Sequence, residues 1–131
     1  NSYYYVKKTT IDTLVAKVGY VPDLIKIDVE GAEFLALTGA QKTAALQQTK
    51  FIVEMHSPPE LPMIENATKV INWCQSNGYI AYYLCDGQEL KEPQTIAHRG
   101  KCHLLLLPAQ QPYPDYLKNI KEGDQLPPTI D

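Results

Sequence analysis

The sequence lacks two features that would assign a protein to a class at once. It has no long apolar run: Leu104 to Leu107 is followed at once by Pro108, and no run approaches the roughly 20 residues of a membrane span. It also has no excess of basic residues, because 12 Lys and Arg stand against 15 Asp and Glu. There is thus little electrostatic attraction for a nucleic-acid backbone. We therefore expect neither a membrane nor a nucleic acid as a partner.

Cysteine is also scarce, and its pattern favours a reducing environment. The sequence has three cysteines, Cys74, Cys85 and Cys102. Because their number is odd and no two form a C-x-x-C pair, they indicate neither a disulfide framework nor a zinc finger. The first residues do not have the charged, apolar and small-residue layout of a signal peptide. We therefore expect a cytoplasmic protein.

The length and composition fit a single globular domain. A chain of 131 residues, 44% of them hydrophobic, can bury one core but not two. It starts with Asn1 rather than Met, and its first residues resemble the middle of a longer sequence. Five of its ten prolines lie from Pro108 onward. We expect one folded unit over residues 1–107 and a Pro-rich C-terminal extension over 108–131.

The hydrophobic pattern predicts alternating helices and strands. Helices are expected from Thr10 to Gly19, from Gly31 to Leu46 with a break near Gly39, and from Met63 to Ser76. Strands are expected at 23–29, 51–56, 79–85 and 101–107, and the last two have no helix between them. This order favours an α/β fold with a mainly parallel sheet covered by helices and a final antiparallel hairpin.

Ionisable residues stand at the ends of the first two strands. Asp28 and Glu30 end the first, and Glu54 and His56 end the second. Strand alternation predicts that the members of each pair share a face, and ligands of open α/β sheets collect at the carboxyl ends of strands. Such a cluster can act as a general base, hold a divalent cation or orient a cofactor. The residue types alone leave these three roles open.

Structural roles compete with these functional ones. Acids at a helix start, such as Glu30 and Glu33, are stabilised by the helix dipole and by capping, and we favour this role for Glu33. His56 also fits a loop histidine at a strand end. A carboxylate after an apolar strand is costly to bury without a partner, which favours a functional role for Asp28.

Four blocks of this sequence form a specific pattern. The blocks are Thr-Thr-Ile-Asp-Thr-Leu at 9–14, Pro-Asp-Leu-Ile-Lys-Ile-Asp-Val-Glu-Gly-Ala-Glu at 22–33, Leu-Thr-Gly-Ala at 37–40 and Ile-Val-Glu-Met-His at 52–56. In these blocks and their spacing the sequence resembles the FkbM family of S-adenosylmethionine-dependent methyltransferases. The resemblance covers about residues 6–107, and its most specific part is the run Ile-Lys-Ile-Asp-Val-Glu-Gly-Ala-Glu.

The resemblance implies a Rossmann-like class I methyltransferase fold, a seven-stranded doubly wound sheet with a reversed final hairpin. On that template Leu24–Asp28 is strand four, Phe51–His56 is strand five, and the last two strands are six and seven. The implied function is methyl transfer from S-adenosylmethionine to a hydroxyl of a small metabolite, sugar or lipid-like acceptor. A magnesium ion is possible but not favoured, and we assign no metal ligand.

The resemblance also implies roles for single residues. Asp28 stands beside the transferred methyl group, while Glu54 and His56 meet the acceptor, with His56 as the preferred base. Asp28, Val29 and Glu30 are expected to contact the cofactor.

The sequence departs from the family in its cofactor motifs. It contains neither the glycine-rich turn after strand one nor the acid after strand two that hold such a cofactor. We therefore expect a C-terminal half of the domain that is inactive alone, with the main cofactor site in a missing N-terminal half. The alternative is a non-catalytic α/β interaction or regulatory domain. A metal-dependent transferase is a third possibility, and the oligomeric state is not encoded in these patterns.

Overall fold

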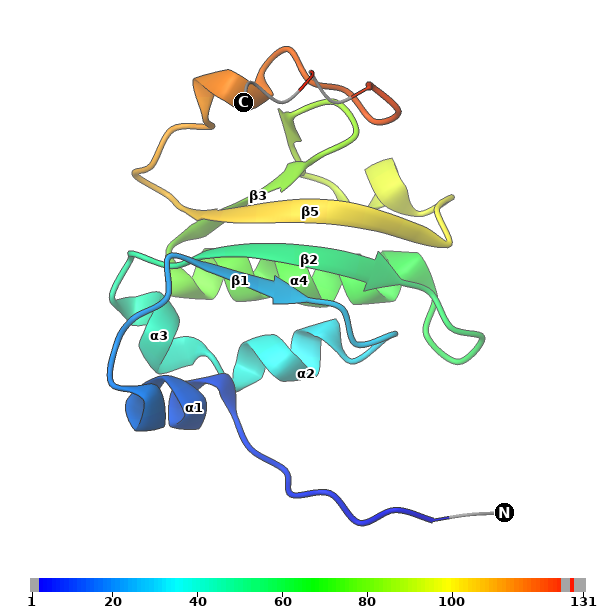
Figure 1. Ribbon diagram of the computed structural model, residues 1–131. Helices are drawn as coiled ribbons and strands as arrows, with labels where there is room; N and C mark the ends of the chain where they lie inside the picture. Colours follow the sequence, from blue (N-terminus) through cyan, green and yellow to red (C-terminus); the bar gives the residue numbers. More distant parts are fainter. Residues whose placement is uncertain (1–2, 126–127, 129–131) are drawn as a thin grey trace.

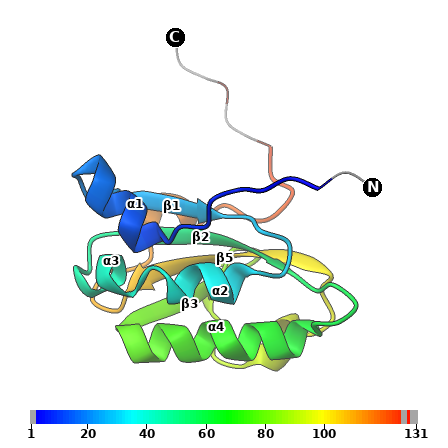
Figure 2. The same cartoon turned by 90° about the horizontal axis from the view of Figure 1, so that it is seen from below.

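A computed structural model describes residues 3–125 and 128 of the chain. It is an α/β structure in which helices α2 and α4 cover one face of a five-stranded sheet (Figures 1 and 2). The strands are β1 Leu24–Ile27, β2 Lys50–His56, β3 Tyr79–Tyr83, β4 Gln88–Glu89 and β5 Lys101–Pro108. The α-helices are α1 Ile11–Val18, α2 Glu33–Thr38, α3 Gln41–Ala45 and α4 Met63–Asn77. Two short 3₁₀ helices span Pro93–Ile96 and Asp115–Leu117.

The sheet is less parallel than the sequence pattern predicts. Its strand order is β1-β2-β5-β3-β4, and only the pair β1 and β2 is parallel among the four neighbouring pairs. Strands β1, β2 and β3 point the same way, but β5 runs against them and lies between β2 and β3. The antiparallel pairing of the last two predicted strands is confirmed, while the expectation of a mainly parallel sheet is wrong for the neighbouring pairs.

The predicted helices form, and their ends follow ordinary capping chemistry. The Thr10 hydroxyl caps α1 by accepting the Thr13 N–H at 3.0 Å, and Gly19 ends that helix in the left-handed conformation. The helix expected over residues 31–46 is divided near Gly39 into α2 and α3, as predicted. Residues 3–8 are exposed and form no strand, although Tyr3 to Val6 are β-prone.

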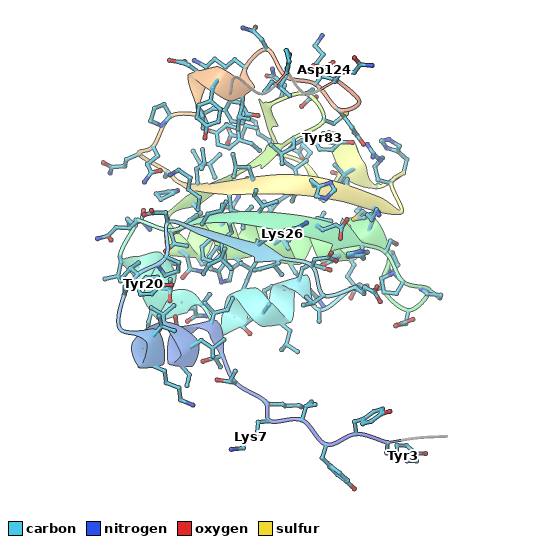
Figure 3. The ribbon with its side chains drawn as sticks, in the orientation of Figure 1. Tyr3, Lys7, Tyr20, Lys26, Tyr83 and Asp124 are labelled. Atoms are coloured by element: carbon cyan, nitrogen blue, oxygen red, sulfur yellow. The ribbon has the colours of Figure 1, made fainter. Side chains whose placement is uncertain are left out.

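The C-terminal extension lies against the side of the sheet where β3 is found. Figure 3 shows Tyr83 of β3 and Asp124 of the extension on the same side of β5. The Tyr113 ring packs on Tyr82 with centroids 5.0 Å apart, and Arg99 Nη2 is 3.2 Å from Glu122 Oε1. The boundary at residues 107 and 108 stays a prediction, and residues 126–127 and 129–131 lie outside the described part. None of the helices in the described residues could cross a membrane.

The core is formed where α4 packs on the sheet. Phe51 of β2 meets Trp73 of α4 and Tyr79 of β3 edge to face, and the Trp73 and Tyr79 rings are tilted against each other, with all ring centroids 5.5–5.7 Å apart. Tyr79 is held further by its hydroxyl, which donates to the Thr49 carbonyl at 2.7 Å. This aromatic group packs α4 against β2 and β3.

Replacing the central ring of this group should destabilise the fold. Phe51 is fully buried, and Phe51→Ala should lower the free energy of unfolding by about 3–5 kcal/mol, because it removes buried apolar surface and leaves a cavity. Urea unfolding followed by far-ultraviolet circular dichroism measures this change. Leu35→Ala on α2 is the control, since Leu35 is 70% exposed and should change the value by less than about 0.5 kcal/mol. Equal effects of the two substitutions would contradict this description of the core.

Candidate active site

The ionisable residues predicted at the strand ends come together. The parallel register pairs Ile27 with Val53, so Asp28 follows β1 beside Glu54 of β2. His56 Nε2 is 3.6 Å from Asp28 Oδ1 and 3.5 Å from Glu54 Oε2. We call Asp28, Glu33, Glu54 and His56 the acid–imidazole cluster. Sequence reasoning predicted three of its four members, because strand alternation puts Glu54 and His56 on one face.

Glu33 is the member for which the sequence favoured a purely structural role. It is the first residue of α2, yet its side chain is fully buried and reaches the end of β2. Its Oε1 accepts a hydrogen bond from the Gly31 N–H at 2.9 Å and lies 2.8 Å from His56 Nδ1. Capping accounts for the first contact only. The second contact connects Glu33 directly to the candidate base.

Asn66 completes the burial of Glu33 from the opposite side. Its Nδ2 donates to Glu33 Oε2 at 3.0 Å and to the His56 carbonyl at 2.9 Å. Asn66 is fully buried in α4, and its Oδ1 has no hydrogen-bond partner among the described residues. The helical pattern of residues 63–76 contains no signal for this role, because a buried asparagine there contacts groups far away in the sequence.

Two nitrogen-bearing side chains of β5 approach Glu54. Lys101 Nζ is 3.6 Å and His103 Nε2 is 3.3 Å from Glu54 Oε1. The antiparallel register pairs Glu54 with His103 and His56 with Lys101, which explains the contacts. Sequence reasoning missed both residues, because it did not place β5 directly beside β2.

The turn from β1 into α2 carries the residues expected to contact a cofactor. Strand β1 ends at Ile27, and Glu30 has a φ of 49°, so the predicted alternation does not extend from Asp28 to Glu30. Val29 and Glu30 are exposed, and neither contacts the acid–imidazole cluster through a hydrogen bond or ion pair within the described residues. Gly31 has a φ of 105°, and a Cβ there would lie 2.9 Å from Pro58 Cγ. Only glycine fits that position.

The pKa values of Glu33 and His56 move in opposite directions. Burial favours neutral Glu33, but hydrogen bonds from Gly31, Asn66 and His56 outweigh it and lower the Glu33 pKa. Burial likewise favours neutral His56, but the hydrogen bond to Glu33 and the charges of Glu33, Glu54 and Asp28 raise the His56 pKa. The pair therefore exists as carboxylate and imidazolium between the two shifted values.

The same shifts determine how the pair contributes to stability as pH changes. The His56 pKa is raised on folding, so its contribution is complete below 6.5 and is lost as pH rises through the raised value. The Glu33 pKa is lowered, so its contribution is present above 4.5 and is lost as pH falls through the lowered value. The ion pair stabilises the fold most at mildly acidic pH.

Asp28 and Glu54 behave as a coupled pair of carboxyl groups. The side-chain hydrogen bond between them is the largest influence on both, and it raises the Asp28 pKa and lowers the Glu54 pKa. Lys101, His103 and His56 also favour the charged form of Glu54. The more exposed carboxyl group, Asp28, therefore binds a proton before Glu54 does as pH falls.

The acid–imidazole cluster is suited to acid–base chemistry, and its spacing is also compatible with a bound metal ion. One ligand atom each from Asp28, Glu54 and His56 lie within 4.8 Å of one another, a spacing compatible with a divalent ion. Lys101 already places a positive charge beside Glu54. The expectation of no metal ligand stays a prediction, as do the catalytic roles of Asp28, Glu54 and His56.

An apolar cavity of about 260 Å³ begins beside the cluster at His103. This cavity is lined by residues just after β3, by one residue of β5 and by the C-terminal extension. Its walls are Leu84, Cys85, His103, Tyr113, Leu117, Ile120, Lys121 and Glu122.

Removing the charge of Glu54 should bring the pKa of the neighbouring Asp28 back toward its ordinary value. In Glu54→Gln the Asp28 pKa should fall toward 3.8, because the competing carboxylate that raises it is gone. Titration of the Asp28 carboxyl carbon by NMR measures this value. Glu65→Gln on the exposed surface of α4 is the control and should leave the Asp28 pKa unchanged. An Asp28 pKa that stays raised in Glu54→Gln would contradict the coupling.

Comparison with known proteins gives the family of the chain. The model of the methyltransferase FkbM domain matches residues 1–81, which is more than half of the sequence and includes α1, β1, α2, β2 and α4. No curated protein and no solved structure matches. The match contains every member of the acid–imidazole cluster. The chain belongs to the FkbM methyltransferase family.

Proposed function

We propose that this chain carries out S-adenosylmethionine-dependent O-methyl transfer, as part of a larger polypeptide, on a hydroxyl of a small metabolite, sugar or lipid-like acceptor. The observation that carries the proposal is the position of His56 Nε2 beside Asp28 and Glu54, at the carboxyl ends of two adjacent parallel strands. This is the edge where open α/β sheets bind their ligands. The family supports methyl transfer in general.

A Rossmann-like class I fold is part of the proposal. Strands β1 and β2 would be its strands four and five, and β3 and β5 its strands six and seven. The reversed direction of β5 between β2 and β3 supports this assignment. The sequence has no glycine-rich turn after a first strand, so we place the main cofactor site in a further N-terminal segment.

The turn after β1 fits a cationic cofactor. When bound, S-adenosylmethionine would supply an electrophilic methyl group carried on a positively charged sulfur. Asp28 is half exposed and presents a carboxylate at this edge, complementary to such a charge. We assign cofactor contacts to Asp28, Val29 and Glu30. A left-handed backbone at a residue other than glycine costs about 1–2 kcal/mol, and Glu30 adopts one, which supports a functional reason for glutamate there.

His56 is the proposed general base. Methyl transfer would form a bond between the acceptor oxygen and the methyl carbon and break the carbon–sulfur bond, whose electron pair would stay on sulfur. His56 Nε2 takes the hydroxyl proton, and the carboxylates of Asp28 and Glu54 stabilise the imidazolium that results. Glu54 would also contact the acceptor. Lys101 forms an ion pair with Glu54 from the side of β5. Positioning of the oxygen against the methyl group supplies much of the rate.

The cavity beside His103 bears on the class of acceptor, and the cysteines bear on the cellular compartment. The cavity that begins at His103 has mainly apolar walls, which favours an acceptor with a hydrocarbon chain or ring near its hydroxyl. We propose a small-molecule acceptor, with neither a nucleic acid nor a membrane as partner. The three cysteines are free, which supports a reducing cytoplasmic setting.

Cofactor binding tests the proposal most directly. Isothermal titration of S-adenosylmethionine into the full-length protein that carries this sequence should show saturable binding, and Glu30→Gly should weaken it at least about threefold. The same substitution should leave the free energy of unfolding unchanged or raise it by up to about 1 kcal/mol, because glycine relieves the left-handed strain.

Two results of this titration would count against the proposal. If the wild-type protein does not bind S-adenosylmethionine, the proposed methyltransferase function is wrong and a non-catalytic interaction domain is favoured. Unchanged affinity in Glu30→Gly would remove Glu30 from the cofactor site. Glu89→Gly on the exposed strand β4 is a control for the loss of one surface charge.

The pH dependence of methyl transfer tests His56 as the base. The His56 pKa is raised, and only the neutral imidazole accepts a proton, so kcat should rise as pH increases through a value above 6.5. Methyl transfer is measured with labelled cofactor at saturating acceptor, with and without EDTA. EDTA should not change the rate, because we assign no metal ligand. A rate in His56→Ala equal to the wild-type rate would overturn the assignment.

A further inference from the structure

We propose that Glu33 is a positioning residue that keeps the proton of neutral His56 on Nδ1 and thereby directs the lone pair of Nε2 toward Asp28 and Glu54. The proposal rests on the proposed function in one respect only, namely that His56 Nε2 takes the acceptor proton. Nothing in the sequence pattern predicted this role, because a glutamate at a helix start is usually a capping residue.

The hydrogen bonds around Glu33 determine which nitrogen of the neutral His56 ring carries the proton. Glu33 Oε1 accepts the Gly31 N–H, and Oε2 accepts from Asn66 Nδ2. Both partners are obligatory donors, so this environment suits an ionised carboxylate, which can only accept. His56 Nδ1, 2.8 Å from Oε1, must then be the donor. In a neutral imidazole, a proton on Nδ1 leaves Nε2 as the acceptor.

The carboxylate is held from three separate elements. Gly31 belongs to the turn after β1, Asn66 to α4 and His56 to the end of β2. Asn66 also donates to the His56 carbonyl, so the backbone and the ring of the same residue are fixed by one connected network. The Glu33 side chain is fully buried, which excludes competing water. This is a rigid support of the kind that orients a reactive group.

The hydrogen bonds that Asn66 donates to Glu33 and His56 lower the stability of the fold, because they leave the other side-chain atom of Asn66 buried without a partner among the described residues. Asn66 Oδ1 is buried and has no partner among the described residues, at a cost of about 1–3 kcal/mol. Rotating the amide would not help, because Oδ1 would then face the Glu33 carboxylate and the His56 carbonyl. The network therefore provides a fixed pair of donors to Glu33 and His56 at the expense of stability.

The other ring nitrogen is left available. His56 Nε2 is 3.6 Å from Asp28 Oδ1 and 3.5 Å from Glu54 Oε2, beyond ordinary hydrogen-bond length. The His56 side chain is 18% exposed, so a small molecule can reach this nitrogen. The two carboxylates would stabilise the imidazolium once a proton is taken. Glu33 thus acts through His56 and does not itself touch the acceptor.

The first measurement needs no variant. The ¹⁵N chemical shifts of the His56 ring, recorded in the full-length protein at a pH above the ring's titration, report which nitrogen carries the proton. We expect the Nδ1–H tautomer to dominate. A neutral ring with its proton on Nε2 would overturn the proposal, whatever the protein catalyses.

The second measurement uses Glu33→Gln and Glu33→Asp. A glutamine can turn its amide toward the ring, and an aspartate is one methylene too short, so both should reduce the fraction of the Nδ1–H tautomer. Both should lower kcat by at least about tenfold, out of the 10²–10⁴ that general-base catalysis supplies, with the dissociation constant of S-adenosylmethionine unchanged within twofold. Glu65→Gln, in an exposed pair with Lys69, is the matched control and should change neither quantity.

The outcomes separate this proposal from the proposed function. A wild-type protein that transfers no methyl group but has the Nδ1–H tautomer, lost in Glu33→Asp, supports the positioning role and defeats the proposed function. An unchanged tautomer in folded variants, or an unchanged kcat in an active enzyme, overturns the positioning role. If Glu33→Gln fails to fold, the wild-type tautomer and Glu33→Asp decide the question.

Discussion

The contact between Glu33 and His56 is the interaction on which the geometry of the candidate active site depends. A single carboxylate group connects the turn after β1, helix α4 and the end of β2. Burying a charge is costly unless it is paired and hydrogen-bonded, and Glu33 meets both conditions through three donors. Removing any one donor would leave a buried charge partly uncompensated. The three elements are therefore constrained to one relative position at the place where chemistry is proposed.

This constraint also explains the local backbone. Gly31 must be glycine because its φ is positive and Pro58 lies against the position of a Cβ. That close approach brings the Gly31 N–H onto Glu33 and turns the chain sharply from β1 into α2. Asp28 is thereby left at the strand end, facing His56, and is not carried on into a longer strand. The geometry of the turn and the polar network are two aspects of one arrangement.

Much of the fold was predictable from the sequence because its signals are local. Helix α1 forms where Thr10 and Gly19 mark its ends, and the strand patterns predicted β1, β2, β3 and β5 within a few residues. Asp28, Glu54 and His56 were predictable because strand ends and strand alternation are also local properties. Glu33 and Asn66 were not, since their roles arise from packing α2 and α4 against the end of β2. Position in a helix indicates capping or burial, but it does not indicate which distant group a buried polar side chain will meet.

The order of the strands governs the balance of charge at the site. A mainly parallel sheet would have placed β3 beside β2, and β3 offers apolar and tyrosine side chains there. Because β5 occupies that position instead, Lys101 and His103 lie opposite His56 and Glu54. The acids thus come from the first half of the chain, while the lysine and the histidine that contact Glu54 from β5 come from the second. The hydrogen bond with Asp28 and, after it, the side chains of β5 therefore favour the ionised form of Glu54. Asp28, on the open side, has the raised pKa and is the carboxyl group whose charge responds to what binds beside it.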